Sequence, residues 1–585
     1  MATTRAPAEP RVGVLTKRGR FLVAEPFFER GRRLNVVLRR RGDARAGDLV
    51  LLRPSRRGGR GTYEVVRRLG RPNVARDVIE ALLLERGYER GVPQRVELEA
   101  REAVSAADPA VSRRDLTAMP TFTIDPASAR DFDDAVSAEP RGDGLRLLVH
   151  IADVGSFVAP GSALDGEAAE RGNSVYVPGT VEPMLPEALS SNVCSLVPGH
   201  ERRTFTVDME LRADGEVGRA SFYRSLIRSD ARMTYEQVDR IFAGAEQPPP
   251  EVAEPLALAR RAAEALRNRR LARGALGVDT SEPEFDFDER GNVVGARDVE
   301  QEESHRVIEQ LMVLANEQVA LRLDTAGIPT VYRVHEQPDP DRVEQLVAQL
   351  ASLDVPTPPV PEHMTPRTAG ELAGRISLML LEYLESGRAG RLALTSLVLR
   401  SLKQAVYSPR NIGHAGLASP AYCHFTSPIR RYPDLVVHRS LLSILAEDDA
   451  PPSHELDRIA AHSTETERRA MELERDADSI CLAFLLEREL AGHGWEETFQ
   501  GEVTGVIPGG VFVSFLWEGV GAASEGFLPV RRIGGDYYDL NEERTALVGR
   551  HTGRTVRLGD PLDVRVRSID APRGRVDLEP AGLAA

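Results

Sequence analysis

Hydrophobic and polar positions change their spacing several times along the chain, and each change marks a different kind of element. Residues 11–70 contain short β-like runs between turns rich in Gly and Arg, which predicts a small β-barrel. Residues 75–112 have helical spacing and predict a linker. Residues 496–580 return to β-like runs and predict a second barrel with five strands. Those strands are "TFQGEVTGVI", "GGVFVSFLW", "GFLPV", "RTVRLG" and "DPLDVRVRSID…RGRVDLEP".

Between the barrels, helical and strand-like patterns alternate. "TFTID" predicts a strand, "PASARDFDD" a loop, and "LRLLVHIADV" (145–154) a buried strand. A Pro-rich break at 355–366 predicts a surface loop, and long helical segments are expected at 368–407 and 454–491. We therefore expect an α+β multidomain protein. Its predicted domains are 1–74 (barrel), 75–114 (linker), 115–492 (mixed α/β body with a helical end) and 493–585 (barrel).

Composition narrows the class of protein. The chain has 585 residues, 42% hydrophobic and 28% charged, which is typical of a globular protein with several domains. The chain contains no run of 18 apolar residues, so no membrane-spanning helix is expected. The first residues lack the apolar core of a secretory signal. Cys194, Cys423 and Cys481 are far apart and odd in number, so they predict neither a zinc site nor a disulfide framework. We expect a cytoplasmic protein with no membrane contact.

Charge is unevenly distributed along the chain. The net charge is −14, yet the first 75 residues carry 19 Lys and Arg against 6 Asp and Glu, a net +13, which leaves −27 for the remainder. A basic module on an acidic body is the pattern expected when one part captures a polyanion. The alternative is a basic surface without a partner.

Four carboxylates lie close together in the predicted loop: Asp125, Asp131, Asp133 and Asp134. Clustered carboxylates repel each other, and a folded protein tolerates them mainly when a hard cation such as Mg²⁺ lies among them. A calcium-binding loop is excluded, because Val136 and Gly142 stand where its glycine and glutamate would be, counting from Asp131. The plain alternative is a solvated turn.

A second motif, "YCHFTSPIRRYPDLVVHR" (422–439), lies far downstream. Together with "TIDPASARDFDD", it closely resembles the catalytic RNB domain of the ribonuclease II and ribonuclease R family. Further stretches match in the same order: "VHIADV" (149–154), "YVPGTVEPMLPEALSSNVCSLVPG" (176–199), "RMTYEQV" (232–238), "RGAL" (273–276), "HRVIEQLMVLAN" (305–316) and "YRVHEQP" (332–338). The resemblance covers roughly residues 10–580.

The resemblance implies a fold. A central RNB domain would be flanked by an N-terminal OB-fold barrel of the cold-shock type and a C-terminal OB-fold RNA-binding barrel. Family members usually carry two barrels before the catalytic domain, whereas this chain has room for one. This departure bears on how far the RNA entry channel reaches.

The resemblance also implies roles for the charged residues. Asp125, Asp131 and Asp134 match residues that hold the metal region. Asp133 matches the residue most critical for the chemical step, either as a further metal ligand or by orienting water. Arg430 matches the catalytic arginine, whose guanidinium can grip phosphate oxygens. Mg²⁺ is the expected ion, with Mn²⁺ as an alternative.

Other matched residues would contact RNA. Tyr235 and Glu309 match contacts to the terminal ribose, and Tyr235 is also counted in the catalytic set. Tyr176 matches an aromatic that stacks on bases, and Glu474 matches an active-site glutamate. Val278 departs from the family, which commonly has an aromatic there as the second face of a base clamp. A weaker clamp and a different limit product are therefore expected.

These inferences predict a hydrolytic, processive 3′→5′ exoribonuclease that releases nucleoside 5′-monophosphates from single-stranded RNA. We expect a monomer that needs no ATP, because the phosphate-loop motif GxxxxGK[ST] is absent. His424 and His438 invite a general-base interpretation, but hydrolysis with metal-activated water needs no histidine base, so core roles are expected. The alternatives are a catalytically inactive RNA-binding relative and a DNA exonuclease.

Overall fold

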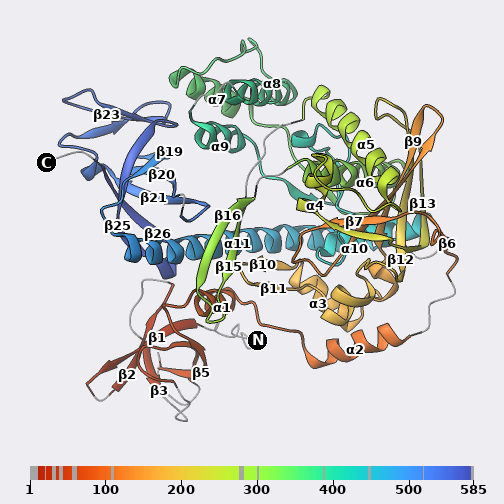
Figure 1. Ribbon diagram of the computed structural model, residues 1–585, viewed down its shortest axis with the longest axis horizontal. Coiled ribbons are helices and arrows are strands. Elements are labelled where there is room, and N and C mark those ends of the chain that lie inside the picture. Colours follow the sequence, from red (N-terminus) through yellow and green to blue (C-terminus); the bar gives the residue numbers. More distant parts are fainter. Residues whose placement is uncertain are drawn as a thin grey trace.

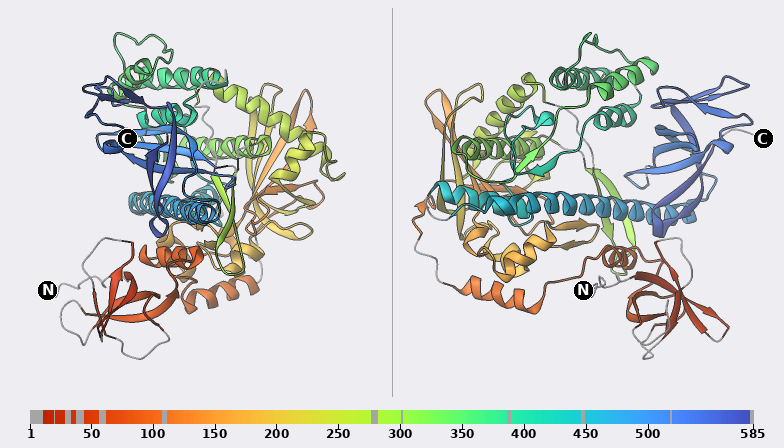
Figure 2. Two further views of the ribbon diagram at one scale, coloured as in Figure 1. Left: turned by 60° about the vertical axis from the view of Figure 1, so that its left-hand side comes forward. Right: turned by 180° about the vertical axis from the view of Figure 1, so that it is seen from behind.

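The computed structural model describes residues 11–19, 21–28, 34–37, 44–55, 62–106, 111–275, 282–299, 302–385, 389–445, 449–517 and 519–581. Figure 1 shows a mixed α/β body at one end of the molecule and two barrels at the other. One long helix runs through the molecule and connects them, and Figure 2 shows the same arrangement from two other sides.

The N-terminal barrel has five strands that close in the order β1-β2-β3-β5-β4. Its strands are β1 (Arg11–Arg18), β2 (Phe21–Pro26), β3 (Leu34–Val37), β4 (Leu49–Pro54) and β5 (Thr62–Gly70). Leu15, Ala24 and Leu52 fill its interior. The outward-facing Val12 and Leu49 pack against Ile79 of helix α1 (Ala75–Glu85). The linker consists of α1 and α2 (Gln94–Ser105), and the non-helical residues 86–93 connect these two helices.

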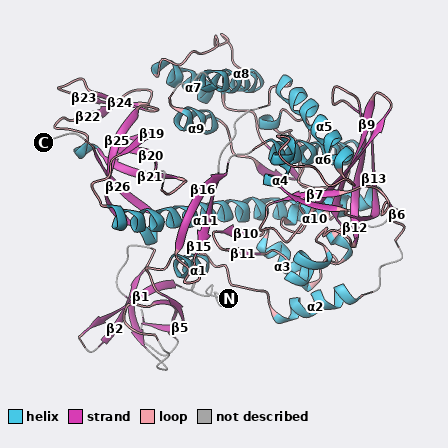
Figure 3. Ribbon diagram, in the orientation of Figure 1, coloured by secondary structure: helices cyan, strands magenta, loops and turns pink. Residues whose placement is uncertain are grey.

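A seven-stranded sheet in the order β14-β7-β8-β9-β12-β13-β6 forms the centre of the body. Its strands are β6 (Arg114–Asp115), β7 (Phe122–Asp125), β8 (Asp134–Arg141), β9 (Gly144–Ala152), β12 (Glu201–Leu211), β13 (Val217–Arg228) and β14 (Ala231–Thr234). The predicted strands at 121–125 and 145–154 correspond to β7 and β9. Figure 3 shows the helices around this sheet and the strands of both barrels.

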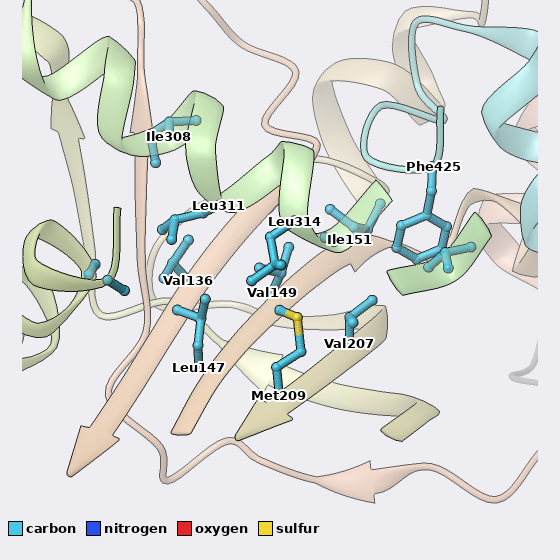
Figure 4. Packing of buried hydrophobic residues seen from close by; sticks show 14 of the residues in the cluster. Val136, Leu147, Val149, Ile151, Val207, Met209, Ile308, Leu311, Leu314 and Phe425 are labelled. Carbon is cyan, nitrogen blue, oxygen red and sulfur yellow. The ribbon is translucent and has the colours of Figure 1, made fainter. Parts of the chain in front are cut away.

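Helices α5 (Ala253–Ala272) and α6 (Glu303–Ala326) cover one face of the sheet. Leu311 and Leu314 of α6 pack on Val149 of β9 and Val207 of β12, and Figure 4 shows this packing. Burial of such apolar side chains is the main favourable contribution to folding. On the other side, α2, α3 (Ala163–Arg171) and α10 (Tyr432–Ile444) build a second core.

Three short antiparallel pairs lie outside the main sheet. They are β10 (Val175–Val177) with β11 (Thr180–Glu182), β15 (Glu282–Phe287) with β16 (Val293–Val299), and β17 (Tyr332–Val334) with β18 (Val406–Ser408). The short helix α4 (Tyr235–Phe242) follows β14 directly.

The predicted helical segment at 368–407 is two helices and a strand. Helices α7 (Pro340–Ser352), α8 (Pro366–Glu385) and α9 (Arg391–Ser401) pack around one small core. Gly390 has φ of 96°, which a side chain would strain, and α9 begins directly after it. Residues 406–408 then form β18, because they pair with β17. The predicted loop at 355–366 precedes α8.

Helix α11 (Ser453–His493) confirms the predicted helix at 454–491 and is 41 residues long. The C-terminal barrel follows it and closes with the strands β19 (Phe499–Ile507), β20 (Gly510–Leu516), β21 (Ala523–Pro529), β25 (Pro561–Asp570) and β26 (Arg575–Pro580). The strand expected from "RTVRLG" is not part of the barrel. It is β24 (Thr555–Arg557), which joins β22 (Tyr538–Leu540) and β23 (Ala546–Gly549) in a separate sheet.

Candidate active site

A cavity of about 410 Å³ lies where β7, α4, α6 and the loop before α10 meet. Eight of the nine residues that the sequence singled out line this cavity: Asp125, Asp131, Asp133, Asp134, Tyr176, Tyr235, Glu309 and Arg430. They come from segments that are up to about 300 residues apart in sequence. The fold therefore brings the two sequence motifs to one place.

The acidic loop connects two neighbouring strands of the sheet. Asp125 is the last residue of β7 and Asp134 the first residue of β8, so strand pairing holds both carboxylates at the same edge. Inside the loop, Phe132 donates its backbone N–H to Ser195 Oγ (3.0 Å), and Ser195 donates its hydroxyl to the Arg130 carbonyl (2.8 Å). These bonds fix the backbone on either side of Asp131.

Asp133 is the most enclosed of the four carboxylates, with 3% of its side chain exposed. The backbone N–H of Ile429 donates to its Oδ1 (2.9 Å), and Arg430 Nε lies 3.6 Å from its Oδ2. Among the described residues, Asp133 Oδ2 and Asp125 Oδ2 are buried and have no hydrogen-bond partner. Buried charged oxygens without partners are costly, which indicates that a ligand completes the site.

Burial makes the acidic cluster hard to ionise. Burial, together with the charge of Asp134, raises the pKa of Asp125 to about 7. Burial raises the pKa of Asp134 to about 6 and the pKa of Asp133 well above its usual range, although Arg430 opposes both shifts. Positive charge that enters the cavity would therefore favour the ionised forms of these carboxyls.

The raised pKa values predict a pH-dependent stability. The folded protein keeps protons on Asp125 and Asp134 that the unfolded chain releases near pH ~4. In metal-free buffer the free energy of unfolding should therefore fall as the pH rises from about 4 to about 7. Mg²⁺ needs the deprotonated carboxylates, so its stabilisation should grow over the same range. Thermal melting with EDTA or Mg²⁺ at several pH values measures both effects.

Other carboxyl groups also titrate in this range, so the comparison with Asp125→Asn isolates the site. Asparagine cannot titrate, and the variant should lose part of the pH dependence and of the Mg²⁺ effect. Equal slopes of melting temperature against pH for the wild type and the variant would contradict the shifted pKa of Asp125.

Hydrogen bonds with buried polar side chains hold the loop that carries Arg430. Asp434 accepts the Ser427 N–H (2.8 Å) and both Nε and Nη2 of Arg431 (2.9 and 2.8 Å). Asn316 of α6 accepts the Phe425 N–H (2.8 Å). Arg431 is therefore a structural clamp, whereas Arg430 keeps 48% of its side chain exposed and points its charge toward Asp133.

Tyr176 and Glu474 are coupled at the rim of the cavity. The hydroxyl of Tyr176 on β10 donates to Asp131 Oδ2 (3.0 Å), and its backbone N–H donates to Glu474 Oε1 on α11 (2.9 Å). Glu474 does not line the cavity. It holds the strand that carries Tyr176, and burial raises its pKa.

Tyr235 and Glu309 lie on the side of the cavity formed by α4 and α6. The Tyr235 ring stacks on His305, with centroids 3.7 Å apart and planes inclined by 13°. Tyr235 is the first residue of α4, whose start is capped by Thr234 Oγ1 accepting the Gln237 N–H (3.2 Å). His305 and Glu309 are one helical turn apart on α6.

Sequence reasoning missed several residues that line the cavity. Five of them share one face of α6 with the expected Glu309: His305, Ile308, Met312, Val313 and Asn316. Their spacing of three and four residues is the signal that could have found them, once Glu309 was placed.

His424 and His438 do not line the cavity: Nδ1 of His424 bonds to Tyr407 Oη (2.7 Å), and Nε2 of His438 to the Phe425 carbonyl (2.8 Å). Val278 lies outside the described residues.

Two features are absent from the part of the chain that the structure describes. No group of three or more His, Cys, Asp or Glu side chains there is arranged to hold a metal ion by itself. Within the same residues, no helix has the length and apolar character to cross a membrane.

Comparisons with known proteins agree with this architecture. The sequence pattern of the RNB domain matches residues 113–447, and that of the S1 RNA binding domain matches residues 493–579. Ribonuclease R of Aquifex aeolicus is 36% identical over 525 residues, which cover 88% of this chain and 72% of the relative. Ribonuclease R of Thermotoga maritima is 39% identical over 481 residues, which cover 80% of this chain and 64% of the relative.

A solved structure is similar over nearly the whole chain. It is described as Mycoplasma genitalium RNase R in complex with ribose methylated single-stranded RNA. The TM-score is 0.86 at 25% identity, over 98% of this chain and 90% of the other. An RNB body with an S1 barrel defines a class of RNA-processing proteins. Within it, this chain belongs to the ribonuclease R family.

Proposed function

We propose that the protein is a hydrolytic, processive 3′→5′ exoribonuclease that degrades single-stranded RNA to nucleoside 5′-monophosphates. One observation carries the proposal. Two buried carboxylate oxygens without hydrogen-bond partners, on Asp125 and Asp133, lie in the same cavity as the half-exposed side chain of Arg430. Family membership supports it, because the curated relatives are ribonucleases R.

The chemistry of the cavity fits a divalent cation. Asp125 and Asp134, with Asp131 and Asp133 beside them, would hold Mg²⁺ or Mn²⁺. Mg²⁺ usually binds through one or two carboxylates and keeps waters and substrate phosphate as its other ligands, so it needs no ready-made cage of three side chains. A bound divalent ion lowers the pKa of a water molecule and neutralises phosphate charge.

The residues of the chain would carry out the remaining steps. A water molecule attacks the last phosphorus in line, and the bond from phosphorus to the 3′ oxygen of the preceding nucleotide breaks. Asp133 would orient that water, which gives up a proton to solvent as it attacks. Arg430 donates hydrogen bonds to phosphate oxygens and offsets the negative charge that develops there. The 3′ oxygen takes up a proton from solvent as it leaves, which regenerates a 3′ hydroxyl for the next cycle.

Aromatic and carboxylate groups would bind the end of the strand. Tyr176 offers a ring for base stacking once its hydroxyl releases Asp131, and stacking of this kind does not depend on sequence. Glu309 and Tyr235 would contact the terminal ribose, whose 2′ hydroxyl distinguishes RNA from DNA. The basic N-terminal barrel and the S1 barrel would capture the strand upstream.

A pair of matched substrates tests the proposal. A labelled RNA strand and a DNA strand of the same sequence are incubated with Mg²⁺ or with EDTA, and the products are resolved by length. We expect metal-dependent release of monophosphates from RNA alone. Binding of RNA without cleavage would support an inactive relative. Equal cleavage of DNA would support a DNA exonuclease, and either result would overturn the proposal.

Oligomeric state, cellular compartment and dependence on ATP also belong to the proposed function. We propose a monomer that acts in the cytoplasm without ATP. The three cysteines are buried and unpaired, which suits a reducing compartment. Light scattering of the purified protein, and turnover in the absence of nucleotide triphosphates, would test the first and last of these points.

A further inference from the structure

Arg270 of α5 reaches the cavity only through another residue. Its Nη2 donates to Glu309 Oε1 on α6 (2.9 Å), and 12% of its side chain is exposed, against 43% for Glu309. Its Nη1 is buried and has no hydrogen-bond partner among the described residues. A largely buried guanidinium paired with a solvent-facing carboxylate gains little stability, because its desolvation offsets the attraction. Stabilisation of the fold therefore does not account for the Arg270–Glu309 pair, and a role in the function of the site does.

The second oxygen of Glu309 is also constrained. The buried Gln310 donates its amide Nε2 to Glu309 Oε2 (3.3 Å). Both oxygens thus have a donor on the protein side, and the carboxylate still lines the cavity. An ionised carboxylate only accepts hydrogen bonds, so its free lone pairs can accept from a hydroxyl in the cavity.

We propose that Arg270 is a positioning residue that sets sugar selectivity, by fixing Glu309 where it accepts a hydrogen bond from a hydroxyl of the 3′-terminal ribose. The inference rests on the proposed function. A free glutamate samples several rotamers and loses that freedom on binding, so it distinguishes ribose from deoxyribose poorly. A glutamate held by Arg270 keeps its acceptor in place for the 2′ hydroxyl, which deoxyribose lacks.

The chain contains a matched control pair between the same two helices. Arg273, the residue that follows α5, points its Nη2 at Glu317 Oε1 on α6 (3.2 Å). Glu317 has 8% of its side chain exposed and does not line the cavity. Loss of either arginine removes one ion pair to α6, but of the two only Arg270 pairs with a carboxylate that lines the cavity.

The experiment compares two 5′-labelled RNA strands that differ only in a 2′-deoxy sugar at the 3′ end. Single-turnover kcat/KM with Mg²⁺ is measured for the full-length wild type, Arg270→Gln, Arg270→Lys and Arg273→Gln. We expect Arg270→Gln to lower the ribose-to-deoxyribose ratio about tenfold, the order of one hydrogen bond, by slowing cleavage of the ribose-ended strand. Arg270→Lys should keep part of the ratio, and Arg273→Gln all of it.

The outcomes separate the inference from the proposed function. If the wild type releases no nucleotide from RNA, the proposed function fails. If the wild type prefers ribose but Arg270→Gln slows both strands by the same factor, the positioning role is wrong. An equal drop of the ratio in Arg273→Gln would also overturn it. Should Arg270→Gln fail to fold, Arg270→Lys decides, because an unchanged ratio there would reject the need for the guanidinium.

Discussion

Replacing Asp133 by asparagine should reduce RNA turnover by a factor on the order of 10³ or more while leaving RNA binding intact. The amide keeps an oxygen that can accept the Ile429 N–H, so the loop should hold its shape. It removes the negative charge that faces Arg430 and the cavity. Single-turnover release of nucleotides measures the first effect, and fluorescence anisotropy with labelled RNA measures the second.

Stability provides an independent check on the same variant. Burial raises the pKa of Asp133 well above its usual range, so a neutral amide should be tolerated as well as the acid, and the melting temperature should not fall. Asp143→Asn, in the exposed turn between β8 and β9, is the matched control and should behave as wild type. More than a tenth of the wild-type rate in Asp133→Asn would contradict the assigned role.

Replacing Arg430 by alanine should lower kcat about 10²- to 10³-fold, the usual cost of removing one group that stabilises charge in a transition state. Because Arg430 lowers the pKa of Asp133, its loss should also move the acid limb of the pH–rate profile to higher pH. Arg430→Lys should recover part of the rate, since lysine keeps the charge but not the two-pronged hydrogen bonding.

Arg228 is a suitable control for Arg430. Its side chain is 46% exposed and pairs with Glu201, and neither residue lines the cavity, so Arg228→Ala should change neither rate nor pH profile. A pH–rate profile of Arg430→Ala with its acid limb in the wild-type position would show that Arg430 does not act on Asp133. Measurement across pH 5 to 9 at saturating Mg²⁺ distinguishes the two results.

Local pattern was a good guide to helices and strands, and a poor guide to which strands pair. The helical spacing at 454–491 predicted α11 to within two residues at either end. The "RTVRLG" segment is a strand as expected, but it pairs with β23 and not with the barrel. Strand pairing depends on contacts distant in sequence, and a six-residue run carries no information about them.

In the site, too, local motifs could be recognised from the sequence, whereas contacts between distant residues could not. The family resemblance carried by the two long motifs placed Asp125, Asp133 and Arg430 in one site, whereas the clustered charges alone left a solvated turn as an alternative. The contacts of Arg270 with Glu309 and of Glu474 with the Tyr176 N–H could not be predicted, since each joins residues at least 39 positions apart that have common structural uses. Such pairs become visible only when helices and strands are packed.

Helix α11 contributes apolar side chains to three separate cores. Leu456 belongs to the core beside α3 and α10, Ile480 to the one around α1, and Leu486 and Leu490 to the interior of the C-terminal barrel. A helix of 41 residues is about 60 Å long. The last barrel is therefore not an independent module. Truncation of the chain after His493 would expose Leu486 and Leu490 to solvent, and the truncated product should aggregate.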